Sequence, residues 1–198
     1  GPARRRSADE DVCKGQAEFL GYAEDINRSW PINGKFTEAN KEIYQLVLDA
    51  QDAAIDCCRV GQAYTAPHDA ARKVLAEGLI QLGISNQSLE EALDLETGDL
   101  RKWYMHNTSH WIGLDVHDVG IYKPNGEPRL LEEGMCLTIE PGLYFGAWRP
   151  DVNCPERYAN LGIRIEDDVL VTSGEPDVLT SACPKTIEEI ESITWKSF

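Results

Sequence analysis

The spacing of hydrophobic residues in the first part of the chain changes from that of strands to that of helices. Residues 17–30 alternate around a glycine and carry aromatic and β-branched side chains, which favours a β-ribbon ended by a turn at 33–34. From Thr37, the expected N-cap, to residue 58, apolar side chains recur every three or four positions. This predicts a helix with one buried face. A second helix is predicted for 67–83, with small residues on its apolar stripe.

The rest of the chain predicts mainly strands. Residues 84–101 are polar and acidic, which predicts a short helix within a surface insertion. Strands are expected at Trp103–His106, His110–Val116, Met135–Ile139, Leu143–Phe145 and Gly162–Val171, with a loop at 146–160 and a closing helix at 184–193. Two helices followed by antiparallel strands are typical of the α+β class.

Composition and charge narrow the classes of function. The chain has 198 residues and a formal net charge of −15, with no apolar run near the roughly 20 residues that span a bilayer. Nucleic acids and anionic membrane surfaces need a basic footprint, so we expect neither as a partner. The six cysteines form no CxxC pair, which favours free thiols in a reducing compartment. We expect a cytoplasmic protein, with mitochondria as the alternative.

Three of the four histidines lie close together. His106, His110 and His117 fall within residues 105–120 of a strongly acidic chain. Acidic residues also interrupt apolar segments elsewhere, as Asp25, Glu140 and Glu166 do. An isolated buried carboxylate is very unfavourable, so each of these acids calls for a partner.

Carboxylate oxygens and imidazole nitrogens are the donors that Mn²⁺, Co²⁺, Zn²⁺ and Fe²⁺ accept. Two such ions about 3.5–4 Å apart can share bridging carboxylates and hold a hydroxide between them. Asp25, His110, Glu140 and Glu166 are therefore candidate ligands.

Each candidate also has an ordinary structural interpretation. His110 could be a hydrogen-bonded core histidine, and Asp25 could cap the ribbon. Glu140 could be a turn residue before Pro-Gly, and Glu166, followed by two more acids, could end a strand in solvent. Residue types and spacing leave these alternatives open. Cys136 lies in an apolar run, so we do not expect it to be a nucleophile.

Four segments together resemble a known family. They are GYAEDINRSWPINGKFT (21–37), HNTSHWIGLDVHDVG (106–120), LEEGMCLTIEPGLYF (131–145) and GIRIEDDVLVT (162–172). In order and separation they are similar to the catalytic domain of aminopeptidase P, the Xaa-Pro aminopeptidases among the pita-bread metallopeptidases. The resemblance implies a pita-bread (creatinase/aminopeptidase) α+β fold, with an antiparallel curved sheet, flanking helices and an incomplete first half. It implies that 17–198 form the C-terminal part of the catalytic domain, and that 1–16 are a disordered or divergent N-terminal segment.

The resemblance also assigns roles to individual residues. It makes Asp25 and Glu166 bridging metal ligands, His110 the histidine ligand and Glu140 a terminal ligand that also moves a proton. It implies two divalent metal ions, with Mn²⁺ as the expected ion and Co²⁺, Zn²⁺ or Fe²⁺ as alternatives.

Four further positions match residues of the family's cleft. His106 and His117 are implied to bind substrate and to stabilise the tetrahedral intermediate. Tyr144 and Arg164 are implied to bind substrate. The implied substrates are peptides with proline in second position, which lose the residue before it, and a homo-oligomer is an open expectation.

The chain departs from the family's pattern at one metal ligand. The family has an aspartate eleven residues before the position of Asp25, where this chain has Lys14. Much of the family's first half, with one further histidine, is also absent. We therefore expect a weakened second metal position and reduced or absent activity. The alternatives are an inactive pita-bread domain that binds peptides or proteins, and a prolidase that acts on Xaa-Pro dipeptides.

Overall fold

The structure is a computed structural model that describes residues 10–15 and 17–194. Its strands are β1 (Glu10–Gly15), β2 (Glu18–Phe19), β3 (Tyr22–Ala23), β4 (Ile26–Pro31), β5 (Cys136–Ile139), β6 (Gly142–Tyr144), β7 (Gly162–Arg164), β8 (Asp167–Leu170) and β9 (Asp177–Val178). Its helices are α1 (Glu38–Ile55), α2 (Ala66–Gln81), α3 (Leu89–Leu93), α4 (Leu100–Trp103) and α5 (Ile187–Thr194), with short 3₁₀ turns at Pro124–Gly126 and Glu156–Tyr158. Both long helices and the closing helix confirm the prediction.

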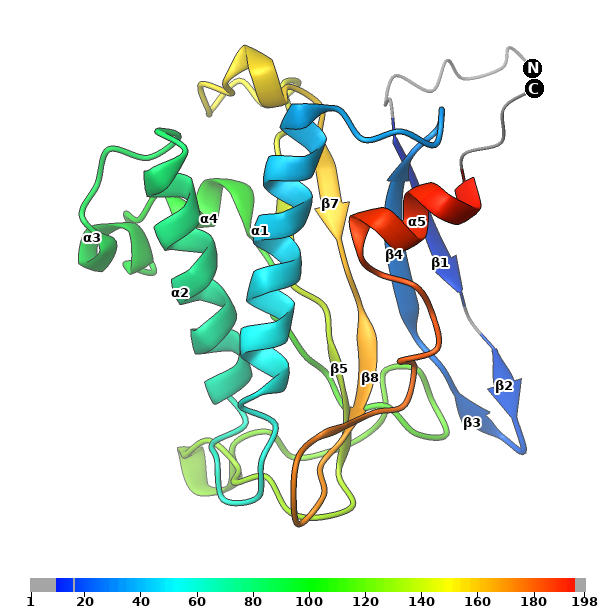
Figure 1. Ribbon diagram of the computed structural model, residues 1–198. Helices are drawn as coiled ribbons and strands as arrows, with labels where there is room; N and C mark the ends of the chain where they lie inside the picture. The colour runs from blue at the N-terminus through cyan, green and yellow to red at the C-terminus, as the bar shows by residue number, and fades with distance from the viewer. Residues whose placement is uncertain (1–9, 16, 195–198) are drawn as a thin grey trace, which may run out of the picture.

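The two long helices pack side by side along one face of the strands (Figure 1). The Thr37 side chain accepts a hydrogen bond from the backbone N–H of Asn40, which confirms the expected N-cap of α1. Close packing of α1 on α2 depends on Gly78, because a Cβ there would overlap the side chain of Leu46. The buried face of α1 lies against β5, β6 and β7.

The strands pair antiparallel in four small sheets. The orders are β5-β8-β9, β6-β7, β1-β4 and β2-β3. A bridge between Asn27 and Glu166 joins β4 to the point where β7 gives way to β8. The single strand predicted at 162–171 is therefore interrupted at Glu166, whose backbone turns to exchange hydrogen bonds of 3.0 and 3.4 Å with Asn27.

Two predicted strands are wrong. Residues 103–106 contain the end of α4 and irregular chain, and 110–116 form no strand. The segment before 113 does run beside β5, with one isolated bridge between Trp111 and Leu137. Side chains replace part of the ladder, since the backbone N–H of His110 donates to the Thr138 hydroxyl. Apolar alternation alone cannot show that substitution.

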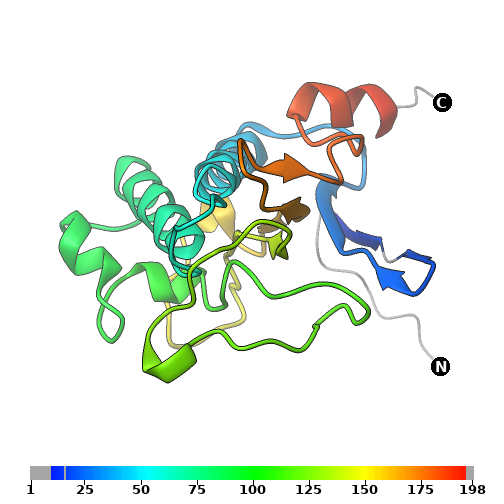
Figure 2. The ribbon, with the colours of Figure 1, turned by 90° about the horizontal axis from the view of Figure 1, so that it is seen from below.

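The segment 105–130 passes below the sheet toward the β2–β3 ribbon (Figure 2). A hydrogen bond of 2.8 Å from the backbone N–H of Ala23 to the carbonyl of Gly113 holds the two together. This contact brings the histidine-rich segment next to the residues that follow β3.

At the start of the chain, Glu10–Gly15 pair with β4 as a strand, where the prediction for 1–16 had allowed disorder. Residues 1–9 and 16 lie outside the described residues, so the prediction for them is not addressed. Within 10–15 and 17–194, no helix is long and apolar enough to cross a membrane.

Candidate metal centre

Asp25 lies between β3 and β4 and is fully buried. Its backbone N–H donates to Oδ2 of Asp168 over 3.1 Å, which fixes the ribbon against β8. Asp25 is therefore a buried carboxylate rather than a solvated residue of the ribbon.

His110 is oriented by its own backbone and by its neighbour. Its carbonyl accepts from the N–H of Thr138 over 3.0 Å, so the residue is anchored to β5. Ring atom Nδ1 lies 3.0 Å from the carbonyl of Trp111. A carbonyl only accepts, so Nδ1 carries a proton, and Nε2 is the ring atom that can offer a lone pair to a metal.

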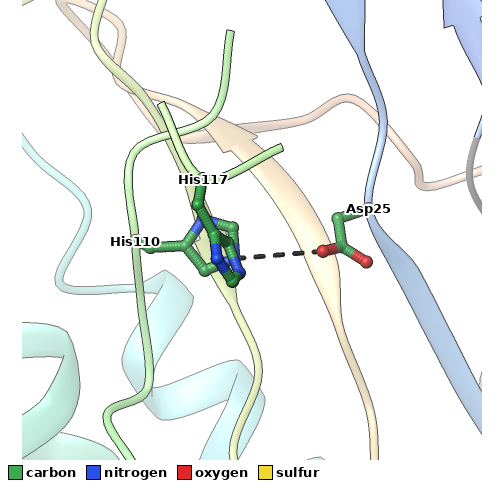
Figure 3. Close-up of side chains that lie close together, drawn as sticks. All are labelled: Asp25, His110 and His117. Carbon is green, nitrogen blue, oxygen red and sulfur yellow. Dashed lines mark ion pairs between the residues drawn. The ribbon is translucent and has the colours of Figure 1, made fainter. Parts of the chain in front are cut away.

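The Nε2 atom of His110 faces two carboxylates. It lies 3.9 Å from Oδ2 of Asp25 and 3.5 Å from Oε1 of Glu140. Figure 3 shows the His110 ring facing Asp25, with the ring of His117 overlapping it in this view. These separations are longer than a hydrogen bond, but they are close to those of two ligand atoms that each lie about 2.0–2.2 Å from a shared ion.

The two glutamates reach the same place from different strands. Glu140 follows β5, and its backbone N–H donates to the carbonyl of Thr108 over 2.8 Å. Glu166 is 1% exposed and lies between β7 and β8. One donor atom from each of His110, Glu140 and Glu166 lies within 4.8 Å of the others, and the same holds for Asp25, His110 and His117.

The structure thus brings together all four candidate ligands, with His110 common to two overlapping groups. Buried carboxylates around an imidazole lone pair are the donor chemistry that divalent ions of the Mn²⁺ to Zn²⁺ series accept. The residues present therefore fit such an ion. Glu166 is not a solvated strand end, because it and the next two acids, Asp167 and Asp168, are at most 4% exposed.

His117 arrives by a turn that the sequence did not predict. The backbone N–H of Asp118 donates to the carbonyl of Trp111, so the chain folds back on itself after 113. The ring of His117 then lies edge-on to that of His110, with centroids 4.2 Å apart. His117 is thus within ligand reach of Asp25 and His110, although the resemblance assigned it to substrate.

His106 is bound by Tyr144 at the other side of the cleft. Its Nδ1 lies 2.8 Å from the carbonyl of Asn107, so Nδ1 donates, and Nε2 accepts from the Tyr144 hydroxyl over 2.8 Å. Burial lowers the pKa of His106. The hydrogen bond to Asn107 partly offsets this shift, and the charge of Arg164 adds to it. Burial also raises the pKa of Tyr144 to about 12. The pair is therefore neutral at pH 7.

Arg164 connects this side of the cleft with the ligands. Its Nε donates to Oδ1 of Asn27 over 2.5 Å, and its Nη1 lies 3.9 Å from Oε2 of Glu140. Arg164 and Glu140 both face a cavity of about 520 Å³. The cavity is lined by Asp25, His106, Asn107, Ser109, His110, His117, Tyr122, Glu140 and Arg164.

Two features of the site were missed by sequence reasoning. The Asp168 carboxylate accepts a hydrogen bond from the backbone N–H of Asp25. Burial raises the pKa of Asp168 to about 7; the hydrogen bond from Asp25 opposes this shift, and repulsion from the Asp25 carboxylate adds to it. His68 binds the segment that carries the histidines, with Nδ1 2.8 Å from the Thr108 hydroxyl. The acidic run within an apolar strand was a signal for Asp168, whereas His68 stands alone on a helix and had none.

Cys136 does not contribute a nucleophile. Burial raises the pKa of its thiol to about 11, which disfavours the reactive thiolate at neutral pH. The five cysteines whose side chains lie in the described part of the chain, 57, 58, 136, 154 and 183, are all free thiols.

Known proteins share both the sequence and the fold. The profile of metallopeptidase family M24 matches residues 12–173. The chain is 40% identical over 188 residues to the Xaa-Pro aminopeptidase of Escherichia coli (strain K12), and 42% identical over 176 residues to that of Haemophilus influenzae. These matches cover 95% and 89% of this chain but only 41% and 40% of the relatives.

Solved structures give the same result. Aminopeptidase PepP of Pseudomonas aeruginosa matches with a TM-score of 0.88 and 40% identity, over 94% of this chain and 41% of that chain. Zinc-substituted E. coli aminopeptidase P in complex with product matches with a TM-score of 0.85 and 40% identity, over 93% and 41% of the two chains. The likeness confirms the expected pita-bread fold, and the chain belongs to metallopeptidase family M24.

Proposed function

We propose that this chain carries the metal and substrate residues of an Xaa-Pro aminopeptidase, which releases the N-terminal residue before a proline. The observation that carries the proposal is the convergence of Asp25, His110, Glu140 and Glu166 on one cleft. The names of the relatives, 40% identical or more, supply the substrate class. The chain spans about 41% of the E. coli relative. That this chain has the relative's activity is therefore proposed on the basis of its site residues.

The four converging side chains would hold divalent ions, with Mn²⁺ as the expected ion. A zinc-substituted relative supports the use of divalent metals in this fold. When bound, such ions polarise the scissile carbonyl and make water a competent nucleophile at neutral pH.

The remaining steps, proton transfer and stabilisation of the intermediate, are assigned to side chains of this chain. Glu140 lies between His110 and Arg164, where it can take a proton from the attacking water and return it to the leaving proline nitrogen. His117 faces the cleft and would stabilise the tetrahedral intermediate, whereas His106, whose two ring nitrogens are bound to Asn107 and Tyr144, would contact the substrate.

Lys14 is the feature that would limit this activity. In the β1–β4 pair its backbone lies opposite Asn27, two residues beyond Asp25. The family's pattern has an acidic ligand at this position. We therefore propose that the second metal position is weakened and that hydrolysis is slow.

The test uses the 198-residue chain and its Lys14→Asp variant. Each protein is loaded with Mn²⁺, its bound metal is measured by elemental analysis, and hydrolysis of Ala-Pro-Ala is followed. We expect the variant to bind one more Mn²⁺ per chain and to turn over at least about tenfold faster. Lys14→Gln is the matched control, since it removes the charge without adding a ligand.

Other outcomes would point elsewhere. Peptide binding with no bound Mn²⁺ in either protein would favour an inactive binding domain. Cleavage of Ala-Pro but not of Ala-Pro-Ala would favour a prolidase. Either result would overturn the proposal.

A further inference from the structure

A second cavity, of about 290 Å³, adjoins the candidate metal centre. It is lined by Met105, Tyr144, Phe145, Gly146, Trp148, Arg149, Asn160, Leu161 and Gly162. None of these residues except Tyr144 has a role in the function proposed above. Its size suits one large side chain rather than a whole cofactor.

Two exposed apolar side chains stand at this cavity above a buried floor. Trp148 is 79% exposed and Met105 is 54% exposed, whereas Phe145 and Leu161 below them are buried. The indole of Trp148 packs against Gly146, where a Cβ would lie 3.0 Å from its Cε2 and Nε1 atoms. Gly146 therefore lets Trp148 lie flat beside the cavity. An aromatic and a flexible thioether that remain in water are suited to cover an apolar ligand group.

The only charged side chain among the lining residues is already neutralised. Arg149 donates to Oδ2 of Asp151 over 2.6 Å and to the carbonyl of Lys102 over 2.6 Å. Its guanidinium is therefore directed away from an incoming anion. The cavity thus favours an apolar group over a carboxylate or a phosphate.

One hydrogen-bonded pair lies between the cavity and the catalytic cleft. Tyr144 lines the cavity, and its hydroxyl is bound by His106, which lines the cleft. Met105 is the neighbour of His106 in the chain and lies on the cavity side. A peptide that crosses this pair would have its reacting carbonyl in the cleft and a later residue at the cavity.

Charges in the cleft set the direction of that peptide. Asp25 and His117 come from the β2–β4 ribbon and the loop beside it, whereas Arg164 lies on β7, paired with the strand that carries Tyr144. The C-terminal carboxylate of a short peptide is attracted to the Arg164 guanidinium, which lies on the side of the cleft where Tyr144 is. The N-terminus therefore lies toward Asp25, and the residues after the scissile bond run toward Tyr144.

We propose that the Met105–Trp148 cavity is a subsite for a large apolar side chain on the residue that follows the proline. This inference rests on the proposed Xaa-Pro aminopeptidase function and deepens it. The cavity selects leucine or phenylalanine over glycine at the third residue of the peptide. The apolar side chain is transferred from water into the space lined by Trp148, Met105 and Leu161.

The test compares Ala-Pro-Gly, Ala-Pro-Leu and Ala-Pro-Phe as substrates of the Mn²⁺-loaded chain. We expect kcat/KM to be about tenfold higher for the leucine and phenylalanine peptides, as for one buried apolar side chain, with the difference in KM. Trp148→Ala reduces the preference to about twofold or less, and Trp148→Phe retains most of it. Leu95→Ala is the matched control, since Leu95 is equally solvent-facing but lies away from the cavity.

A second measurement does not need turnover. The EDTA-treated protein is titrated with Ala-Pro-Phe while the indole ¹H–¹⁵N resonance of Trp148, assigned by its absence in Trp148→Phe, is followed. We expect this resonance to shift with Ala-Pro-Phe and not with Ala-Pro-Gly. Equal responses to both peptides would overturn the subsite.

The two measurements separate the two proposals. Hydrolysis of all three peptides at equal kcat/KM, unchanged in Trp148→Ala, would reject the subsite and leave the aminopeptidase function standing. A phenylalanine-dependent shift of Trp148 in a protein that cleaves none of the peptides would reject the aminopeptidase function and leave the subsite standing.

Discussion

Asp167 and Asp168 are adjacent at the start of β8, yet their carboxylates meet different surroundings. Asp167 accepts from Nη2 of Arg28 over 2.7 Å and lies 3.3 Å from Nζ of Lys185. Asp168 instead accepts from the backbone N–H of Asp25, which lines the cleft, and burial raises the pKa of Asp168 to about 7. Successive side chains of a strand point to opposite faces, so one acidic run supplies both environments.

The difference separates charge that supports the fold from charge that supports binding. Behind the sheet, each donor nitrogen of Arg28 has a described acceptor, including the carbonyls of Glu166, Cys183 and Pro184. That network fixes the backbone of a candidate ligand and the segment before α5. In the cleft, acids lie near one another and near His110, an arrangement that favours an added cation.

Removal of Arg28 is expected to have the largest effect on stability. Arg28→Met removes the guanidinium from the buried Asp167 carboxylate, which keeps only the Thr180 hydroxyl and the Lys185 ammonium, and this should lower the free energy of unfolding by about 3 kcal/mol or more. Urea unfolding of the metal-free protein at pH 7 measures the loss. If the variant were destabilised by less than about 1 kcal/mol, as is usual for a surface pair, the network would not support the fold.

Two controls sharpen this prediction. Arg59 pairs with Glu175 at the surface, so Arg59→Met should change stability by less than about 1 kcal/mol. In the double variant Arg28→Met/Asp167→Leu no buried carboxylate is left behind, so part of the lost stability should return.

The sequence predicted the helices and the segments of the site well, for a physical reason. The buried face of α1 repeats every three to four residues and is capped by Thr37, so its signal is local. Acids in apolar strands marked Glu166 in the same way. Such local conflicts between charge and burial can be read without coordinates.

The network behind the sheet could not be predicted in this way. Arg28 and Asp167 are separated by 139 positions, and Arg28 is a single basic residue in a polar ribbon. The path of residues 108–118 was also hidden. There, the hydroxyls of Thr138 and Tyr122 accept backbone hydrogen bonds that a regular strand would give to backbone carbonyls.

His68 supports the histidine-rich segment of the cleft as a neutral group, in contrast to the charged Arg28–Asp167 network. Its Nδ1 accepts from the backbone N–H of Thr108, and burial lowers its pKa to about 4, with the charge of Arg72 as the next cause. The unfolded chain, with an ordinary pKa near 6.5, then binds more protons between about pH 4 and 6.5. Stability is therefore full above about pH 6.5 and falls toward pH 4, by up to about 3 kcal/mol.

The matched variant for this prediction is His68→Asn, which keeps an acceptor for Thr108 but cannot be protonated. Urea unfolding of both proteins at pH 4.5, 5.5 and 7.5 gives their stability difference at each pH. We expect the natural protein to lose stability relative to the variant as the pH falls. A difference that is constant with pH would show that His68 is not held neutral.

Metal binding gives the smallest expected change and the most direct test of the cleft. At a free Mn²⁺ concentration of a hundred times Kd, binding to the folded state alone adds about 2.7 kcal/mol to stability. Asp25→Asn removes one candidate ligand, so most of this gain should disappear. In EDTA the same substitution should leave stability nearly unchanged or raise it, because the repulsion between Asp25 and Asp168 is removed.

Thermal and urea unfolding with EDTA or Mn²⁺ measure both effects. Asp177→Asn is the control, since Asp177 is an exposed acid on β9 and should keep the full response to Mn²⁺. If Asp25→Asn were destabilised in EDTA as much as Arg28→Met, Asp25 would be an acid that supports the fold, as Asp167 does. A variant that kept the whole Mn²⁺ response would remove Asp25 from the candidate ligands, because a lost ligand must weaken the binding that provides the stabilisation.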